Sequence, residues 1–141
     1  MVFFEKEKLE INPQNCSNEY KPTDNSVVFE IDFGKAIVNS ISYKAIKFAL
    51  SVNKNKKNSP LRAELKGIAL FSFKDTNEDF SEEEKIERMF IFNGTSIVFS
   101  FLRGYIFAKM GDLNPNCKIL PTVNLLDVIK KAIEDKTKKE R

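Results

Sequence analysis

The sequence has no histidine, no tryptophan and only two cysteines in 141 residues. Without histidine, it lacks the side chain that most often serves as a general base near neutral pH. Cys16 and Cys117 form no CxxC motif, so we expect neither a disulfide framework nor a zinc site. The glycine-rich loops that bind phosphate groups are also missing. We therefore expect no enzyme, no metal and no cofactor.

Long hydrophobic runs are scarce as well. Charges begin at Glu5, so the N-terminus has no apolar segment typical of a signal peptide. The most apolar stretch, residues 94–110, contains Ser100, Arg103 and Lys109, and a membrane span needs about 20 predominantly apolar residues. The sequence thus predicts a cytoplasmic protein that does not associate with a membrane.

An excess of charge of one sign is almost absent. The chain has 23 Lys and Arg against 20 Asp and Glu, a net charge of +3. Residues 130–141 carry this whole excess, because the preceding residues are balanced. A nucleic-acid-binding domain usually carries a basic stripe on its folded face, so we expect no nucleic-acid partner. We expect residues 137–141 to form a frayed basic tail.

Four segments alternate apolar and polar residues with the period of a β-strand. They are residues 2–11, 27–33, 41–52 and 61–73. The charges of the first segment favour an edge position, where they discourage pairing with other chains. In the last segment the alternation changes phase near Gly67, which predicts a β-bulge there.

The second half of the chain has the period of helices. Ser81 begins a capping-box pattern, Asn93-Gly94 is expected to end that helix, and a more apolar helix is expected over residues 95–110, ended by Gly111. A last helix, capped by Thr122 or Asn124, is expected from Leu125 to about residue 136. Strands grouped before helices predict a single α+β domain over residues 1–136, with a four-stranded antiparallel sheet covered by two C-terminal helices.

The predicted helix 95–110 is apolar around most of its circumference. A helix that covers a sheet needs only one apolar stripe, so the second apolar face must be buried elsewhere. Three interpretations are open: a central core helix, an oligomer interface, or a groove for apolar ligands.

Three segments together resemble the SecB family of protein-export chaperones: residues 61–73, residues 93–106 (Asn-Gly-Thr-Ser-Ile-Val-Phe-Ser-Phe-Leu-Arg-Gly-Tyr-Ile) and residues 119–125 (Ile-Leu-Pro-Thr-Val-Asn-Leu). The resemblance covers about residues 27–135. It implies four antiparallel strands followed by two helices, and a homo-oligomer built as a dimer of dimers with the long helix between the dimers. The interface residues it implies are Ile97, Phe101, Tyr105 and Ala108.

The resemblance implies an ATP-independent holdase that keeps unfolded polypeptides in hydrophobic grooves, often for delivery to the SecA motor. The client-binding residues expected on this basis are Phe29, Ile31, Phe33, Leu102, Leu120, Val123 and Leu126. Ordinary core packing is the alternative role for each of them. Glu64, with Glu7 and Glu10, is the expected docking site for SecA. Some SecB-like chaperones protect an antitoxin instead, so an antitoxin is the alternative partner.

Overall fold

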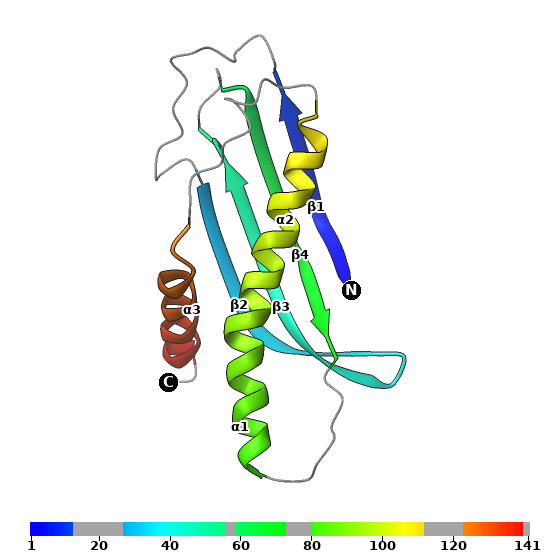
Figure 1. Cartoon of the computed structure of the whole chain (residues 1–141), viewed down its shortest axis with the longest axis vertical. Helices are drawn as coiled ribbons and strands as arrows, with labels where there is room; N and C mark the ends of the chain where they lie inside the picture. The colour runs from blue at the N-terminus through cyan, green and yellow to red at the C-terminus, as the bar shows by residue number, and fades with distance from the viewer. Residues whose placement is uncertain (13–26, 56–58, 73–79, 112–122, 140–141) are drawn as a thin grey trace.

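The computed structural model describes residues 1–12, 27–55, 59–72, 80–111 and 123–139 (Figure 1). Four strands, β1 (Val2–Ile11), β2 (Val27–Val38), β3 (Ile41–Val52) and β4 (Leu61–Phe71), come first. The helical segments follow: α1 (Phe80–Met89), η3 (Phe90–Gly94), α2 (Thr95–Lys109) and α3 (Leu125–Lys139). The predicted α+β class is confirmed. Outside the described part lie Cys16, Cys117, Leu120 and Thr122, together with the side chain of Ser81.

The strands form one antiparallel sheet in the order β1-β4-β3-β2, so β1 is an edge strand as predicted. β2 runs to Val38, five residues beyond the predicted end, and pairs with β3 along its whole length. The two strands meet in a tight turn at Asn39 and Ser40, whose φ angles are 52° and 67°. Two consecutive residues with positive φ give the turn the twist that a two-residue hairpin requires.

The bulge lies in β1 and not in β4. β4 pairs with β3 in continuous register, whereas the pairing of β1 shifts between Phe4 and Lys6. The prediction of a bulge in β4 was therefore wrong, because the bulge is in the neighbouring strand β1. Gly67 still has a role, because an added Cβ would lie 2.1 Å from the carbonyl oxygen of Phe3 and 2.9 Å from Cζ of Phe48. Glycine at this position lets β1 approach closely.

The helix does not end at Asn93-Gly94. α1, η3 and α2 form one continuous helical segment, and Gly94 has helical φ and ψ angles of −60° and −44°. Gly94 is buried, and an added Cβ would lie only 3.1 Å from Cδ1 of Ile46 on β3. The predicted break is thus wrong, since the glycine serves close packing against the sheet and a π-helical turn continues the helix.

Because of this continuity, the helical segment Glu84–Lys109 is long and apolar enough to cross a membrane by length and composition. The expectation that no segment would reach that length was wrong. Buried core helices pass the same test. Here the side chains of Val98, Leu102 and Ile106 are at most 2% exposed and belong to the core.

The core lies between one face of the sheet and the helices. α1 and α2 cross that face, and α3 lies beside β2 (Figure 1). The ring of Phe90 contacts Phe33 and Phe71, with centroids 5.6 and 5.7 Å apart. Lys44 of β3 forms an ion pair with Glu87 and thereby attaches α1 to the sheet. Within the described part of the chain, no helix covers the opposite face.

α3 begins where the sequence predicts. The side-chain oxygen of Asn124 accepts hydrogen bonds from the backbone N–H groups of Leu126 (3.1 Å) and Asp127 (3.4 Å), which confirms Asn124 as the N-cap. The helix runs to Lys139, so residues 137–139 of the expected frayed tail are helical. Thr137 donates a hydrogen bond to the carbonyl oxygen of Ile133.

Candidate functional site

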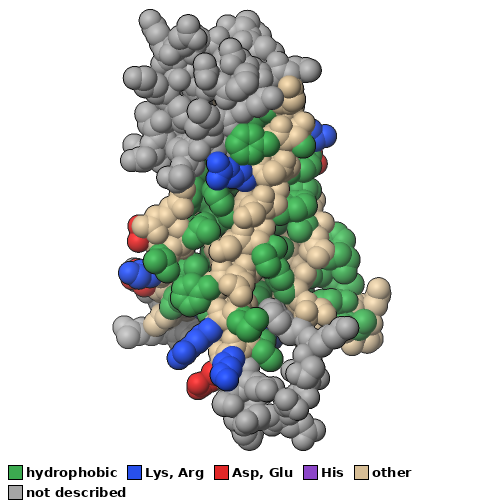
Figure 2. All heavy atoms as spheres, viewed as in Figure 1, with side chains coloured by type: hydrophobic (Ala, Val, Ile, Leu, Met, Phe, Trp, Pro, Cys, Tyr) green, Lys and Arg blue, Asp and Glu red, His purple; other side chains and the backbone are tan. Residues whose placement is uncertain are grey.

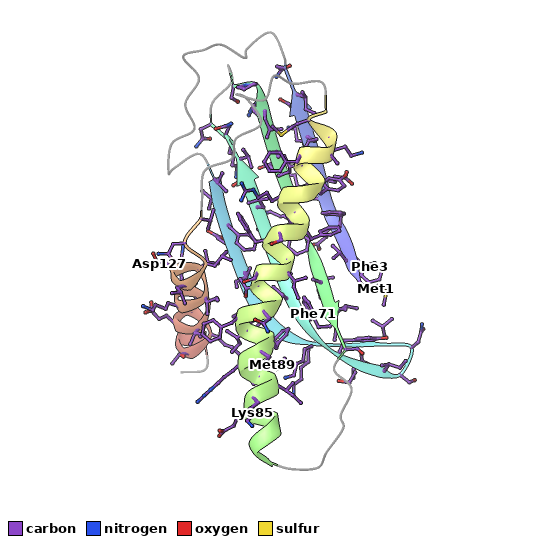
Figure 3. All side chains as sticks on the ribbon, viewed as in Figure 1. Met1, Phe3, Phe71, Lys85, Met89 and Asp127 are labelled. Carbon is purple, nitrogen blue, oxygen red and sulfur yellow. The ribbon has the colours of Figure 1, made fainter. Side chains whose placement is uncertain are left out.

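A groove of about 390 Å³ lies between the edge strand β2 and α3. Eight residues line it: Phe29, Glu30 and Ile31 from β2, and Asp127, Val128, Lys131, Ala132 and Asp135 from α3. The α3 residues recur at intervals of three or four, so they share one side of the helix. Asp127 is labelled in Figure 3.

The floor of the groove is apolar. Phe29 is 5% exposed, and its ring packs against Phe99 of α2 with the centroids 5.2 Å apart. Ile31 and Val128 are half-buried on either side, and Ala132 is buried as part of the core cluster. Part of this apolar surface therefore faces solvent and is free to contact a ligand.

The rim of the groove is acidic. Glu30, Asp127 and Asp135 contribute carboxylates, and Lys131 contributes the one cation among the lining residues. The ammonium of Lys131 lies 3.9 Å from the carboxylate of Glu30, so it offsets one negative charge. An apolar floor with an acidic rim suits a peptide in which apolar side chains lie beside cationic ones.

The structure brings together only part of the predicted client-binding set. Phe29 and Ile31 line the groove, and Val123 is half-buried against the core near the start of α3. Phe33 and Leu102 are 8% and 0% exposed. Both side chains are part of the core, which is the alternative role considered for them. Leu126 is 56% exposed, but it lies on the other side of α3 from the groove residue Val128, because the two residues are only two positions apart in the helix. Leu120 lies outside the described residues.

Sequence reasoning missed the five α3 residues of the groove. Asp127, Lys131 and Asp135 follow one another at intervals of four, next to the apolar stripe of the helix. This spacing places them in a row along one flank. Every amphipathic surface helix has charged residues beside its apolar stripe, so this spacing alone does not indicate a groove.

The four predicted interface residues share an exposed side of α2. Ile97 and Phe101 are 56% and 44% exposed, Ala108 is exposed, and Tyr105 is half-buried. The rings of Phe101 and Tyr105 also pack on Phe4 of β1, with centroids 6.3 and 5.2 Å away. Figure 2 shows apolar side chains along this helix on the viewer's side of the molecule. The structure thus leaves apolar surface uncovered where the sequence predicts an interface.

The predicted docking site for SecA is not assembled. Glu10 and Glu64 lie on the uncovered face of the sheet, whereas Glu7 pairs with the core residue Leu65 and lies on the face that the helices cover. Residues an odd number apart on a strand point to opposite faces, and no bulge falls between Glu7 and Glu10. The structure therefore does not bring the predicted trio together on one face.

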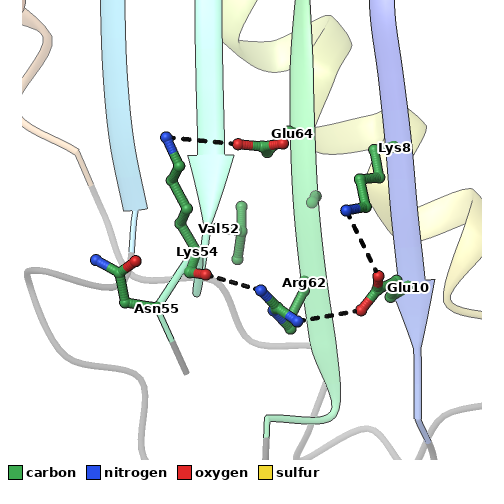
Figure 4. A pocket seen from close by; sticks show the side chains of 8 residues that line it. Lys8, Glu10, Val52, Lys54, Asn55, Arg62 and Glu64 are labelled. Carbon is green, nitrogen blue, oxygen red and sulfur yellow. Dashed lines mark hydrogen bonds and ion pairs between the residues drawn. The ribbon is translucent and has the colours of Figure 1, made fainter. Parts of the chain in front are cut away.

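Cations lie beside Glu10 and Glu64 on that face (Figure 4). Glu10 pairs with Arg62 (3.3 Å) and Lys8 (3.9 Å). Glu64 pairs with Lys6 (2.9 Å) and Lys54 (3.5 Å). The hydrogen bond from Lys6, followed by the charges of Lys6 and Lys54, lowers the pKa of Glu64, although partial desolvation opposes the change. These pairs also surround a shallow hollow of about 210 Å³.

No protein-family model matches the chain, and no curated protein sequence matches it. One solved structure matches: a SecB-like chaperone of Mycobacterium tuberculosis, Rv1957, in complex with a ChAD peptide from the Rv1956 HigA1 antitoxin. The sequences are 14% identical, the match covers 88% of this chain and 87% of the other, and the TM-score is 0.40. Among the described residues, no group of three or more Asp, Glu, His or Cys side chains is placed to hold a metal ion.

Proposed function

We propose that this protein is an ATP-independent cytoplasmic holdase that binds unfolded polypeptides, with the groove between β2 and α3 as a client site. The observation that carries the proposal is the partly exposed apolar floor formed by Ile31 and Val128 beside the buried Phe29. The resemblance of residues 61–73, 93–106 and 119–125 to SecB chaperones supports the same function.

The physical requirement for a holdase is modest. An unfolded chain exposes aliphatic and aromatic side chains, and burying them contributes about 25 cal/mol per Å² without a sequence code. A protein that binds the unfolded state and not the native state of a client shifts the client's folding equilibrium toward the unfolded state. The acidic rim at Asp127 and Asp135 favours client segments that also carry lysine or arginine.

The exposed side of the long helix supports assembly into an oligomer. Met89, Phe92, Ile97 and Phe101 are each 44–56% exposed. Exposed apolar residues that recur along one helix are typical of protein-protein contacts. We propose that Ile97, Phe101, Tyr105 and Ala108 form the contact between copies of the chain, as the SecB resemblance implies.

A second candidate function is the protection of one antitoxin. The matching SecB-like chaperone is in complex with an antitoxin peptide, and the charges at the rim of the groove would favour one peptide sequence over others. A specific adaptor would bind one peptide tightly and leave unrelated unfolded proteins to aggregate. A panel of unrelated clients therefore separates the two functions.

The proposal is tested by the aggregation of a chemically reduced, unfolded test protein at an equimolar ratio. The wild type should suppress the light scattering, and the double variant Ile31→Thr/Val128→Thr should suppress it much less, because both changes place a hydroxyl on the groove floor and Ile31→Thr also removes apolar volume. The matched control is Val28→Thr, since Val28 is 48% exposed on β2 but lies on the opposite sheet face. Holding by the groove is refuted if the wild type fails with every client or if the double variant behaves like the control.

A further inference from the structure

The sheet face opposite the helices carries an excess of positive charge. Among the residues that the structure describes, six cations lie on it or at its rim: Lys6, Lys8, Lys47, Lys54, Arg62 and Lys66. Four carboxylates share this face: Glu10, Glu30, Asp32 and Glu64. The local charge of +2 is noteworthy because the first 129 residues are neutral as a whole. The fold has therefore separated charges that balance in the sequence.

Two lysines of this face stand directly across from each other. Lys6 of β1 and Lys66 of β4 are paired residues in the register of the sheet. Directly opposed side chains of like charge destabilise an antiparallel pair. Lys6 has Glu64 as a partner, but within the described residues Lys66 forms no ion pair. The sheet thus keeps an unfavourable contact that an acidic ligand would relieve.

A third lysine continues the row. Lys66 pairs with Ala49 of β3, and Lys47 lies two residues from Ala49, on the same face. Lys47 is exposed, and it forms no ion pair with any described residue, although Asp32 is its neighbour across the strands. Two unpaired ammonium groups are therefore available on adjacent strands.

Apolar side chains border these lysines. Phe3 is 48% exposed and is paired with Ile68, which is half-buried next to Lys66 (Phe3 is labelled in Figure 3). We refer to Lys6, Lys47, Lys66, Phe3 and Ile68 as the lysine patch. An exposed phenylalanine beside cations offers both hydrophobic and electrostatic contacts to a partner.

We propose that the lysine patch binds an acidic polypeptide segment that also carries apolar side chains. The interspersed carboxylates Glu10 and Glu64 disfavour a nucleic acid, because they would repel a continuous phosphate backbone. A peptide can place its carboxylates over Lys47 and Lys66 and an apolar side chain against Phe3. This surface differs from the proposed client groove in location and in charge, so the two sites would recognise peptides of opposite charge.

The test measures the binding of a fluorescein-labelled 15-residue peptide of glutamate with three interspersed leucines, by fluorescence anisotropy at low ionic strength. The double variant Lys47→Gln/Lys66→Gln should weaken binding by about fivefold or more, since two exposed ion pairs with the peptide are lost. The control Lys85→Gln/Lys130→Gln removes the same charge from exposed positions on α1 and α3 and should leave binding within about twofold.

Three further arms make the result decisive. The affinity of a lysine-leucine peptide of the same length should be no higher for the wild type than for the double variant. The groove variant Ile31→Thr/Val128→Thr should bind the acidic peptide like wild type, which separates this inference from the proposed function. The double variant Lys47→Gln/Lys66→Gln should keep the melting temperature of the wild type, which shows that lost binding does not reflect unfolding. Equal loss in the control, no preference for the acidic peptide, or tighter binding of single-stranded DNA would each overturn the proposal.

Discussion

The rings of Phe29 and Phe99 pack against each other across the interface between β2 and α2, with centroids 5.2 Å apart and planes at 50°. Phe29 also forms part of the groove floor. One side chain therefore belongs to both the core and the candidate site. Substituting it would change stability and binding together, which is why the groove test uses its neighbours Ile31 and Val128.

Replacement of Phe29 by alanine should destabilise the fold by about 3–5 kcal/mol, because it removes a buried aromatic side chain and leaves a cavity. Phe3→Ala is the matched control, since this phenylalanine is 48% exposed on the other sheet face. The substitution should lower the free energy of unfolding by only about 0.5 kcal/mol. Urea denaturation followed by circular dichroism measures both. Equal losses for the two variants would contradict the assignment of Phe29 to the core.

Gly67→Ala should destabilise the sheet by about 1–3 kcal/mol or more, because the new Cβ would lie 2.1 Å from a backbone oxygen of Phe3 that cannot move away freely. Gly104→Ala is the control: nothing lies within 4 Å of its Cβ position in α2, so replacing glycine should stabilise the helix by about 0.5–1 kcal/mol. Thermal unfolding of the two variants should therefore shift in opposite directions. A neutral Gly67→Ala variant would mean that β1 does not approach β4 this closely.

The sequence predicted the sheet well because alternation is a local property of each strand. β1 and β3 have the predicted bounds, and Val27, Phe29, Ile31 and Phe33 of β2 face the core. The predicted helix break was wrong. Asn93-Gly94 has the residue types of a helix end, but packing against Ile46 decides the conformation of Gly94. Tertiary contacts of this kind leave no trace in the local pattern.

The candidate site was less predictable than the fold. In the nearly all-round apolar helix, nothing local shows that Leu102 is buried and Phe101 is 44% exposed. The choice between them depends on how the helix is rotated against the sheet. By contrast, the separation of Glu7 from Glu10 followed from strand alternation alone and was available in the sequence. The groove itself needs α3 to lie beside β2, which only the tertiary structure provides.

The exposed side of α2 predicts that the protein is larger than a monomer in solution at micromolar concentration. Ile97→Asp should reduce the mass measured by sedimentation, because a charge would be buried without a partner in the contact between copies. Ile97 is preferable to Phe101 for this test, since Phe101 also stacks on Phe4 within the chain. A monomeric wild type, or an unchanged mass for the variant, would refute this interface.

The ion pair between Lys6 and Glu64 should make stability depend on pH. Because the folded state lowers the pKa of Glu64, the carboxylate stabilises the fold above its ordinary value of 4.5, and this contribution is lost as the pH falls through that value toward the lowered one. Lys6→Gln removes the largest cause of the lowered pKa. The variant should therefore differ from wild type in pH dependence at acidic pH, with a greater relative loss of stability at pH 7 than at pH 3.

The control for this prediction removes the titrating group itself. In a Glu64→Gln background, Lys6→Gln should have the same effect at pH 7 and at pH 3, because the carboxylate whose pKa Lys6 lowers is then absent. Urea denaturation at both pH values gives the four free energies for each background, and an NMR titration of the Glu64 carboxyl carbon follows its pKa directly. A Glu64 pKa that stays the same in Lys6→Gln would show that Lys6 does not hold the Glu64 carboxylate.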